Sequence, residues 1–329
     1  MNKNLEVNPL KYTEIDQIED LITHFQFKPF YYYNIDNLKL SKYFLYSLKK
    51  EDAILTVKKN KKILGAAILV DLPWDSNLFG IKMAKISYVL TKKTAPFPMD
   101  IVDRLISAVL DLCKERNIQH ISCHVDSKNT FFIHRLEEKG FHLMDTMVIY
   151  SISLKDQDME TEVTNQSFIE RKAEKKDLSE MQELAGKAFI NPNIFLSRFY
   201  IDPLLRKNAG KLYREWLKNS LMGEQADIVF IAESDNKPIG FITCLLPEKK
   251  SVEILNKRIG TIPLNATSSE FRGQGVYNQL LKHSLNWFRK QDVDFVEIKT
   301  QIITLPVQRA WQKLGGTLVS SYHTLHKEI

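Results

Sequence analysis

The chain has 329 residues, a length that is typical of two domains and excludes a single small binding module. Apolar residues make up 44% and charged residues 26%, which is ordinary usage for a folded protein and excludes a disordered or fibrous chain. The net charge of +6 is spread along the sequence without a long basic tract, so we do not expect a dedicated nucleic-acid binder.

Nothing in the sequence predicts a membrane segment or a secretion signal. The longest apolar run, residues 63–70, has about eight residues where a membrane-spanning helix needs roughly twenty. The first residues carry charges and a proline where a signal peptide has its apolar segment. Cys113, Cys123 and Cys244 lie among apolar neighbours, as buried thiols in a reducing compartment do. We therefore expect a cytoplasmic protein.

In the first half, apolar runs over 53–58 and 63–72 flank Lys-Asn-Lys-Lys and predict a β-hairpin. Residues 102–113 carry an apolar stripe at helical spacing, and the alternation over 118–125 predicts a strand after it. Residues 129–140 return to helical spacing and end on a glycine, a residue suited to the left-handed turn after a helix.

The second half repeats this order of elements. Gly140 and Gly315 are 175 positions apart, and the helical and strand residues around them fall in the same register at that offset. Runs over 228–233 and 238–246 likewise flank a turn signal. We infer a duplicated α+β fold in which helices flank mixed, mostly antiparallel sheets.

A polar, acidic stretch over residues 155–164 lacks any apolar periodicity. This stretch predicts the boundary between a first domain, 1–158, and a second domain, 165–329.

The two copies differ most at one turn. In the second copy a strand expected over 262–267 is followed by Arg272-Gly273-Gln274-Gly275-Val276-Tyr277, which opens a helix over 277–289. Such a turn presents free backbone N–H groups at a helix N-terminus, where phosphate oxygens are favoured. The first copy has two prolines, an aspartate and no glycine over 94–100. We therefore predict that only the second half binds an anion.

The set Arg272-x-x-Gly275-x-Tyr277, between a strand and a helix, resembles the pyrophosphate loop of the GCN5-related N-acetyltransferases, the GNAT superfamily. The resemblance implies two GNAT-like domains, of which the N-terminal one is degenerate, and acetyl-coenzyme A as the acyl donor. Tyr277 departs from the small residue that the family usually has. The residues that the resemblance assigns to the coenzyme are Leu264, Asn265 and Ala266 through backbone groups, Arg272, Gly273, Gln274, Gly275, Val276 and Tyr277 at the pyrophosphate, and Thr304, where the family often has asparagine.

Further segments indicate a more specific resemblance, to one family within this superfamily. Ser197-Arg198-Phe199-Tyr200-x-Asp202-Pro203, with Tyr213-x-x-Trp216, and Leu72-Pro73-Trp74-Asp75-Ser76 are similar to the TDP-fucosamine acetyltransferase family. This similarity implies an acceptor amine on a nucleotide-linked 4-amino-4,6-dideoxyhexose. Arg198 is the candidate for the nucleotide diphosphate, and Tyr200 or Trp216 for stacking beside it.

The sequence offers three candidates for the general acid. The family places a tyrosine on the helix after the fifth strand, where this chain has Trp311, whose indole N–H can donate a hydrogen bond but not a proton. Tyr277 and Tyr322 are the other candidates. We expect no metal, because His120, Cys123 and His124 lie on one strand and point to opposite faces.

Two other functions remain open. The chain could acetylate another amine, on a peptide terminus or an antibiotic, or it could be a coenzyme-binding regulator without turnover, which Trp311 and Thr304 would favour. We expect no nucleic-acid or membrane partner, and the oligomeric state stays open, with a homodimer among the alternatives.

Overall fold

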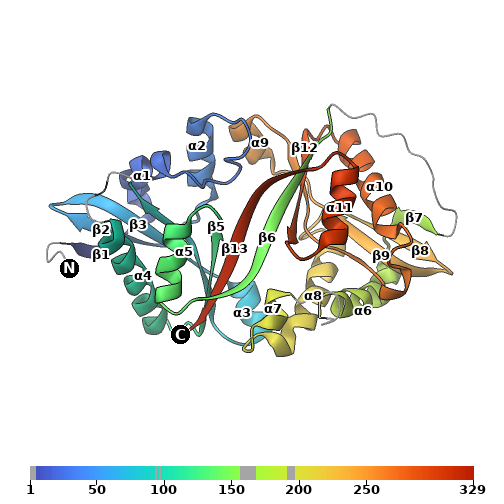
Figure 1. Ribbon diagram of the computed structural model, residues 1–329, viewed down its shortest axis with the longest axis horizontal. Coiled ribbons are helices and arrows are strands. Elements are labelled where there is room, and N and C mark those ends of the chain that lie inside the picture. The colour runs from blue at the N-terminus through green and yellow to red at the C-terminus, as the bar shows by residue number, and fades with distance from the viewer. Residues whose placement is uncertain (1–4, 93–94, 96–97, 156–167, 191–196) are drawn as a thin grey trace. The chain divides into compact units, whose positions relative to one another are not determined.

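The structure is a computed structural model that describes residues 5–92, 95, 98–155, 168–190 and 197–329 (Figure 1). It divides into an N-terminal unit, Met1–Thr146 with Ser321–Ile329, and a C-terminal unit, Met147–Ser320. Nearly all of the stretch 155–164, where we expected the domain boundary, falls outside the described residues.

The N-terminal unit has one sheet in which β1, β2, β3, β4 and β5 lie in sequence order and the end of β13 follows β5. The β4–β5 pair is parallel and the other pairs are antiparallel. Its elements are β1 (Glu6–Leu10), the 3-10 helix Tyr12–Ile18, α1 (Glu19–His24), α2 (Asn37–Ser47), β2 (Ala53–Lys59), β3 (Lys62–Asp71), α3 (Pro73–Phe79), β4 (Met83–Thr91), α4 (Pro98–Glu115), β5 (His120–Asp126), α5 (Thr130–Glu138) and the start of β6 (His142–Ser153).

The C-terminal unit contains the strand order β6-β12-β10 and a second sheet, β11-β9-β8-β7. Among the described strands of this unit, β10 and β12 pair in parallel and the other pairs are antiparallel. Its elements are the end of β6, β7 (Ile169–Lys172), the 3-10 helix Lys175–Asp177, α6 (Leu178–Ala188), α7 (Arg198–Ile201), the 3-10 helix Arg206–Asn208, α8 (Ala209–Leu221), β8 (Ile228–Ser234), β9 (Lys237–Cys244), α9 (Lys249–Leu255), β10 (Ile259–Ile262), β11 (Asn265–Thr267), the 3-10 helix Ser269–Phe271, α10 (Val276–Lys290), β12 (Phe295–Gln301), α11 (Leu305–Lys313) and the start of β13 (Thr317–Glu328).

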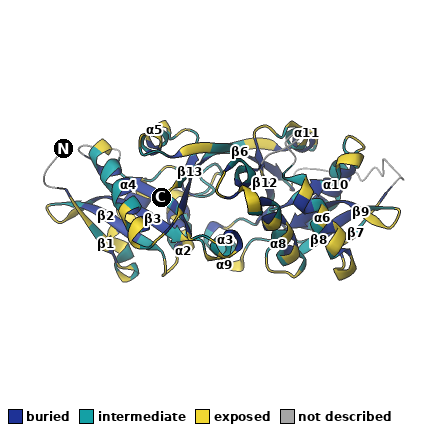
Figure 2. Ribbon diagram, turned by 90° about the horizontal axis from the view of Figure 1, so that it is seen from below, coloured by how far each residue is buried: buried dark blue, intermediate teal, exposed yellow. Residues whose placement is uncertain are grey.

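The duplicated order of elements is confirmed. The predicted hairpin corresponds to β2 and β3, and the predicted helix, strand and helix correspond to α4, β5 and α5. Gly140 and Gly315 both follow their helices with left-handed φ angles, +78° and +81°. The strands are mostly buried while the helices expose one face, as expected for amphipathic helices that flank sheets (Figure 2).

The last strand of each sequence copy pairs with a strand of the other copy. Residues 147–153 of β6 pair antiparallel with β12, and residues 322–328 of β13 pair antiparallel with β5. The expected domains, 1–158 and 165–329, therefore differ from the two compact units. Alternating apolar residues predict that a segment is a strand, but they do not specify which sheet it joins.

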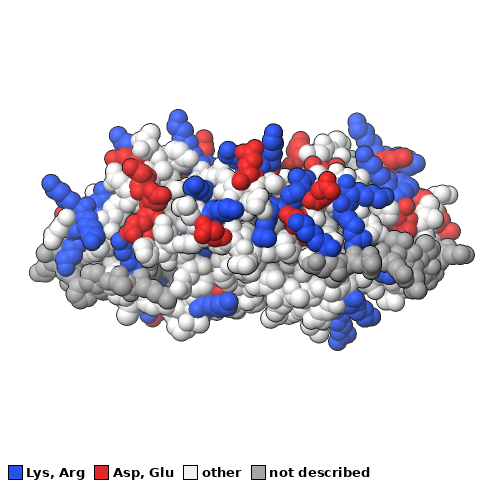
Figure 3. Space-filling view, turned by 90° about the horizontal axis from the view of Figure 1, so that it is seen from above, with Lys and Arg blue, Asp and Glu red and all other residues white. Residues whose placement is uncertain are grey.

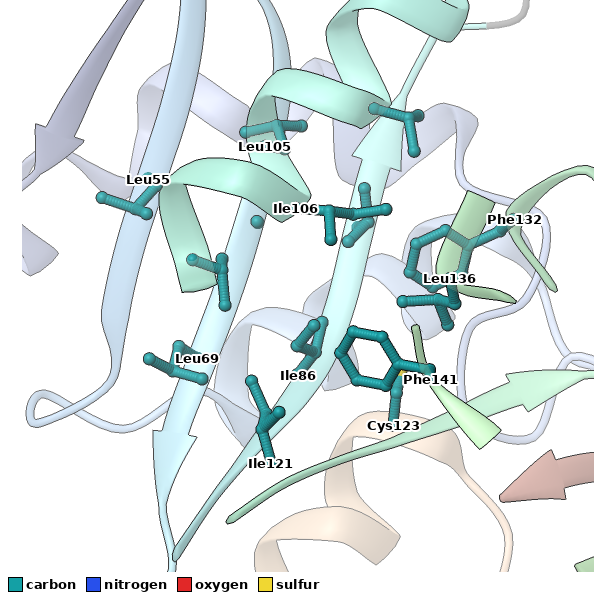
Figure 4. Packing of buried hydrophobic residues seen from close by; sticks show 14 of the residues in the cluster. Leu55, Leu69, Ile86, Leu105, Ile106, Ile121, Cys123, Phe132, Leu136 and Phe141 are labelled. Atoms are coloured by element: carbon teal, nitrogen blue, oxygen red, sulfur yellow. The ribbon is translucent and has the colours of Figure 1, made fainter. Parts of the chain in front are cut away.

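In the core of the N-terminal unit α4 packs on β2, β3 and β4 (Figure 4). Cys113 and Cys123 lie in this core, and Cys244 lies in the core of the C-terminal unit. All three thiols are buried, as predicted, and burial raises the pKa of each to about 12.

Replacing Gly65 with alanine is expected to lower the free energy of unfolding by about 1–3 kcal/mol. A methyl group there would lie 2.6 Å from Cγ2 of Ile101 and 3.1 Å from the carbonyl oxygen of Leu90. Urea denaturation measures the loss, with Lys62→Ala at the exposed start of the same strand as control. Equal stability of the two variants would contradict the close approach of α4 to β3.

No helix among the described residues combines the length and the apolarity that a membrane crossing requires. Lys and Arg side chains are interspersed with Asp and Glu on the face shown in Figure 3, in agreement with the scattered charge of the sequence.

Candidate functional site

The strand expected over 262–267 is interrupted in the structure. β10 ends at Ile262 and pairs with β12, whereas β11 starts at Asn265 and pairs with β9. Pro263 lies between them and has no N–H to give to a ladder, so the prediction of one continuous strand is wrong. As a result β11 lies at an edge of its sheet.

The three residues predicted to bind pantetheine differ in the direction that their backbone N–H and carbonyl groups face. The N–H of Leu264 donates to Oγ1 of Thr243 at 2.9 Å, and its carbonyl accepts from the backbone N–H of Thr243 at 2.9 Å. The N–H of Ser268 donates to the carbonyl of Ile239 on the same side. Because backbone groups alternate in direction along a strand, Ala266 also faces β9, and Asn265 faces the free edge. The backbone of Leu264 is therefore already used, which corrects its assignment to the coenzyme.

The glycine turn has the geometry that the sequence predicts. Gly273 and Gly275 have φ angles of +77° and +85°, and Gly275 immediately precedes α10. A Cβ atom at either glycine would meet no atom within 4 Å, so the turn faces open space. The first backbone N–H groups of a helix have no partner within the helix. This turn therefore presents donors to a ligand at the start of α10.

Arg272 carries an unused donor beside this turn. Its Nε donates to the carbonyl of Thr267 at 3.3 Å, but its Nη1 is buried and has no hydrogen-bond partner. Burial lowers the pKa of the guanidinium, because the charged form loses hydration. A buried donor without a partner costs about 1–3 kcal/mol, more if charged, so an anion here would offset a cost that the fold already bears.

A pocket of about 330 Å³ opens beside the turn, between α10 and α11. Its described lining includes two lysines and no carboxylate, and Oε1 of Gln279 is buried there without a hydrogen-bond partner. The lining residues are Gln274, Gly275, Asn278, Gln279, Lys282, Ala310, Lys313 and Leu314. Lys282 and Lys313 were missed by the sequence reasoning, although Gly275, Asn278 and Lys282 share one helical face with the turn.

Thr304 lies at the start of α11 as predicted, but its side chain does not cap that helix. Its Oγ1 is buried and has no partner. This oxygen is thus available to a ligand, as are Nη1 of Arg272 and Oε1 of Gln279.

Comparisons with known proteins agree with this geometry. Residues 189–316, which include the turn, the pocket and Thr304, match the model of the acetyltransferase (GNAT) family. The region that matches, residues 189–316, is called the GNAT domain.

Similar proteins cover nearly the whole chain. The spore coat polysaccharide biosynthesis protein SpsD of Bacillus subtilis is 20% identical over 270 residues, which are 82% of this chain and 85% of SpsD. The crystal structure of a GCN5-related N-acetyltransferase from Sphaerobacter thermophilus aligns with 100% of this chain and 96% of its own at a TM-score of 0.65 and 13% identity. A tandem GNAT protein from the clavulanic acid biosynthesis pathway aligns with 98% of both chains at a TM-score of 0.58 and 12% identity. These likenesses show a tandem GNAT fold. The match of residues 189–316 to the family model is what identifies an acyl-CoA N-acyltransferase.

In this GNAT domain Trp311 is a packing residue. Its side chain is 0% exposed within the core of the C-terminal unit, and its indole N–H donates to the hydroxyl of Tyr277 at 2.9 Å. The structure thus corrects the assignment of Trp311 as a catalytic group, because its one donor is already used. Burial raises the pKa of Tyr277, so its phenol stays protonated and remains the candidate acid.

Tyr322 belongs to the N-terminal unit instead. It lies on β13 opposite Asp126, and its ring centroid is 5.0 Å from that of His124. The structure therefore does not assign it to the unit that carries the glycine turn.

The acceptor candidates lie on two helices of the GNAT domain. Arg198 and Tyr200 are on α7, which Ser197 caps, and the Arg198 guanidinium lies 4.5 Å from the Phe199 ring centroid. Trp216 is half-buried on α8 and stacks on Tyr213 with centroids 6.3 Å apart and planes 14° apart. The aromatic spacing of α8 therefore reflects stacking within the unit, although Trp216 keeps part of its surface exposed.

Proposed function

We propose that this N-acetyltransferase moves the acetyl group of acetyl-coenzyme A to the amino group of a nucleotide-linked amino-deoxy sugar. The main support for acetyl-coenzyme A as the acyl donor is the buried Nη1 of Arg272, which has no hydrogen-bond partner and lies at the open glycine turn. The acceptor class is supported by the segments around Arg198 and Trp216 and by the name of the relative SpsD, which refers to polysaccharide biosynthesis.

The residues present fit the coenzyme. Arg272 and the N–H groups from Gly273 to Tyr277 would hold the pyrophosphate, and the lysines of the pocket, Lys282 and Lys313, would face the remaining phosphate. The free edge at Asn265 would pair with a pantetheine amide as an added strand does. Oγ1 of Thr304 would supply one further hydrogen bond.

The transfer needs little acid catalysis from the protein. The neutral amine attacks the thioester carbonyl, a C–N bond forms, the C–S bond breaks, and the amine proton passes to solvent. A thiol has a pKa of about 8.5, so the sulfur leaves readily as thiolate near neutral pH. Tyr277, held by the indole N–H of Trp311, is the group that we propose to protonate it.

The test is a panel of acceptors with acetyl-coenzyme A, read as free thiol release and product mass. We expect turnover with TDP-4-amino-4,6-dideoxyhexoses and none with the same sugars already N-acetylated, because these have no nucleophilic amine. Arg198→Ala should raise KM for the sugar nucleotide without changing KM for the coenzyme.

Turnover of a peptide terminus or an aminoglycoside in place of the sugars would overturn the acceptor class. Coenzyme binding by calorimetry with no product from any amine would favour the regulator instead.

A further inference from the structure

The N-terminal unit contains a pocket of its own, of about 440 Å³. This volume lies within the range of small-molecule sites. The pocket is lined by the end of α1, the segment between α1 and α2, and the turn after β5. The lining residues are Thr23, His24, Phe25, Gln26, Phe27, Lys28, Tyr31, Asn37, Leu40 and Lys128.

Lys28 gives this pocket a buried positive charge. The residue is only 3% exposed, and its Nζ donates to the carbonyls of Thr23 and Phe25 and to Oδ1 of Asn37. All three acceptors are neutral, and no carboxylate of the described residues forms an ion pair with Lys28. Burial without a counter-ion lowers the pKa of this ammonium. An anion in the pocket would compensate the buried charge.

The pocket also presents aromatic rings. The Phe27 ring lies edge-on to those of Phe25 and Tyr31, with centroids 5.9 Å and 6.0 Å away. The hydroxyl of Tyr31 donates to Oδ2 of Asp126 at 2.6 Å, which fixes the position of that ring. All three rings are half-buried, so each offers surface to a flat ligand.

Lys128 connects the aromatic and the cationic features. Its ammonium lies 5.5 Å from the Tyr31 ring centroid. Lys128 is exposed on its turn, so this second positive charge can reach a phosphate group in the pocket. At the offset of 175 residues this turn corresponds to the one that leads into α11 of the GNAT domain. The lining residues of this pocket do not correspond at that offset to those of the pocket beside the glycine turn, so the two pockets offer different chemistry.

We propose that this pocket binds a nucleoside phosphate, with the base against Phe27 and Tyr31 and the phosphate at Lys128, where its negative charge would offset the buried charge of Lys28. An anion alone would leave the rings unused, and a flat neutral ligand would leave the buried charge of Lys28 uncompensated. The proposal does not depend on the acceptor of the acetyl transfer.

Calorimetry on the full chain tests this, with thymidine 5′-monophosphate as the probe and thymidine and inorganic phosphate for comparison. We expect the monophosphate to bind best and Lys128→Ala to weaken it by about tenfold, as for loss of a charge-assisted contact. Phe27→Leu should weaken it as well, with the fold checked by thermal denaturation. Lys50→Ala, an exposed lysine of the same unit outside the pocket, is the matched control and should have no effect.

Arg272→Ala separates this pocket from the coenzyme site. It should leave binding of the monophosphate unchanged even if the chain acetylates no sugar. Wild-type affinity in both Lys128→Ala and Phe27→Leu, equal affinity for inorganic phosphate, or loss of binding in Arg272→Ala would each overturn the proposal.

Discussion

Arg272→Ala is expected to weaken acetyl-coenzyme A binding by about ten- to a hundredfold while leaving the fold intact. The guanidinium has one buried nitrogen without a partner, so a phosphate oxygen would make a charge-assisted contact of roughly 1.5–3 kcal/mol there. The free protein loses only the 3.3 Å bond to the carbonyl of Thr267, so its melting temperature should hardly change. Calorimetry with the coenzyme measures the effect.

Lys290→Ala provides the control, since Lys290 is exposed at the other end of α10. Arg272→Lys should recover part of the affinity, because a lysine keeps the charge but not the planar fork. Coenzyme affinity unchanged in Arg272→Ala would remove this residue from the site and weaken the case for the turn itself.

Trp311→Ala is expected to lower the free energy of unfolding by about 3–5 kcal/mol, because it leaves a large cavity in a close-packed core. The side chain is fully buried among residues of α10, β12 and β6, and its N–H is bonded to Tyr277. Urea denaturation followed by circular dichroism measures the loss. Arg309→Ala, on the exposed side of α11, should change stability by less than about 0.5 kcal/mol.

Trp311→Phe distinguishes the packing of this ring in the core from its hydrogen bond to Tyr277. Phenylalanine retains most of the ring but lacks the N–H, so the fold should persist while Tyr277 loses its partner. If Tyr277 protonates the leaving thiolate, Tyr277→Phe lowers kcat and changes its pH profile, and Trp311→Phe does so less strongly. A Trp311→Ala variant as stable as the wild type would show that this residue is not part of the core.

Local sequence patterns determine much of the fold. The stripe over 102–113, the alternation over 118–125 and the matching register of Gly140 and Gly315 depend on neighbours along the chain, and the structure has those helices, strands and turns. The glycine turn was predictable for the same reason, since left-handed φ angles are accessible to glycine at little cost.

The tertiary structure decided what depends on residues far apart in the chain. Hydropathy could not assign the ends of β6 and β13 to opposite units, because strand pairing is a contact between distant segments. Nor could it show that Thr243 uses the backbone of Leu264, or that Trp311 bonds to Tyr277. The sequence by itself determined that the C-terminal copy has the glycine turn before a helix. Only the packing of α10 and α11 decided which side chains remain available to a ligand there, because burial and hydrogen bonding between helices remove some donors and leave others unused.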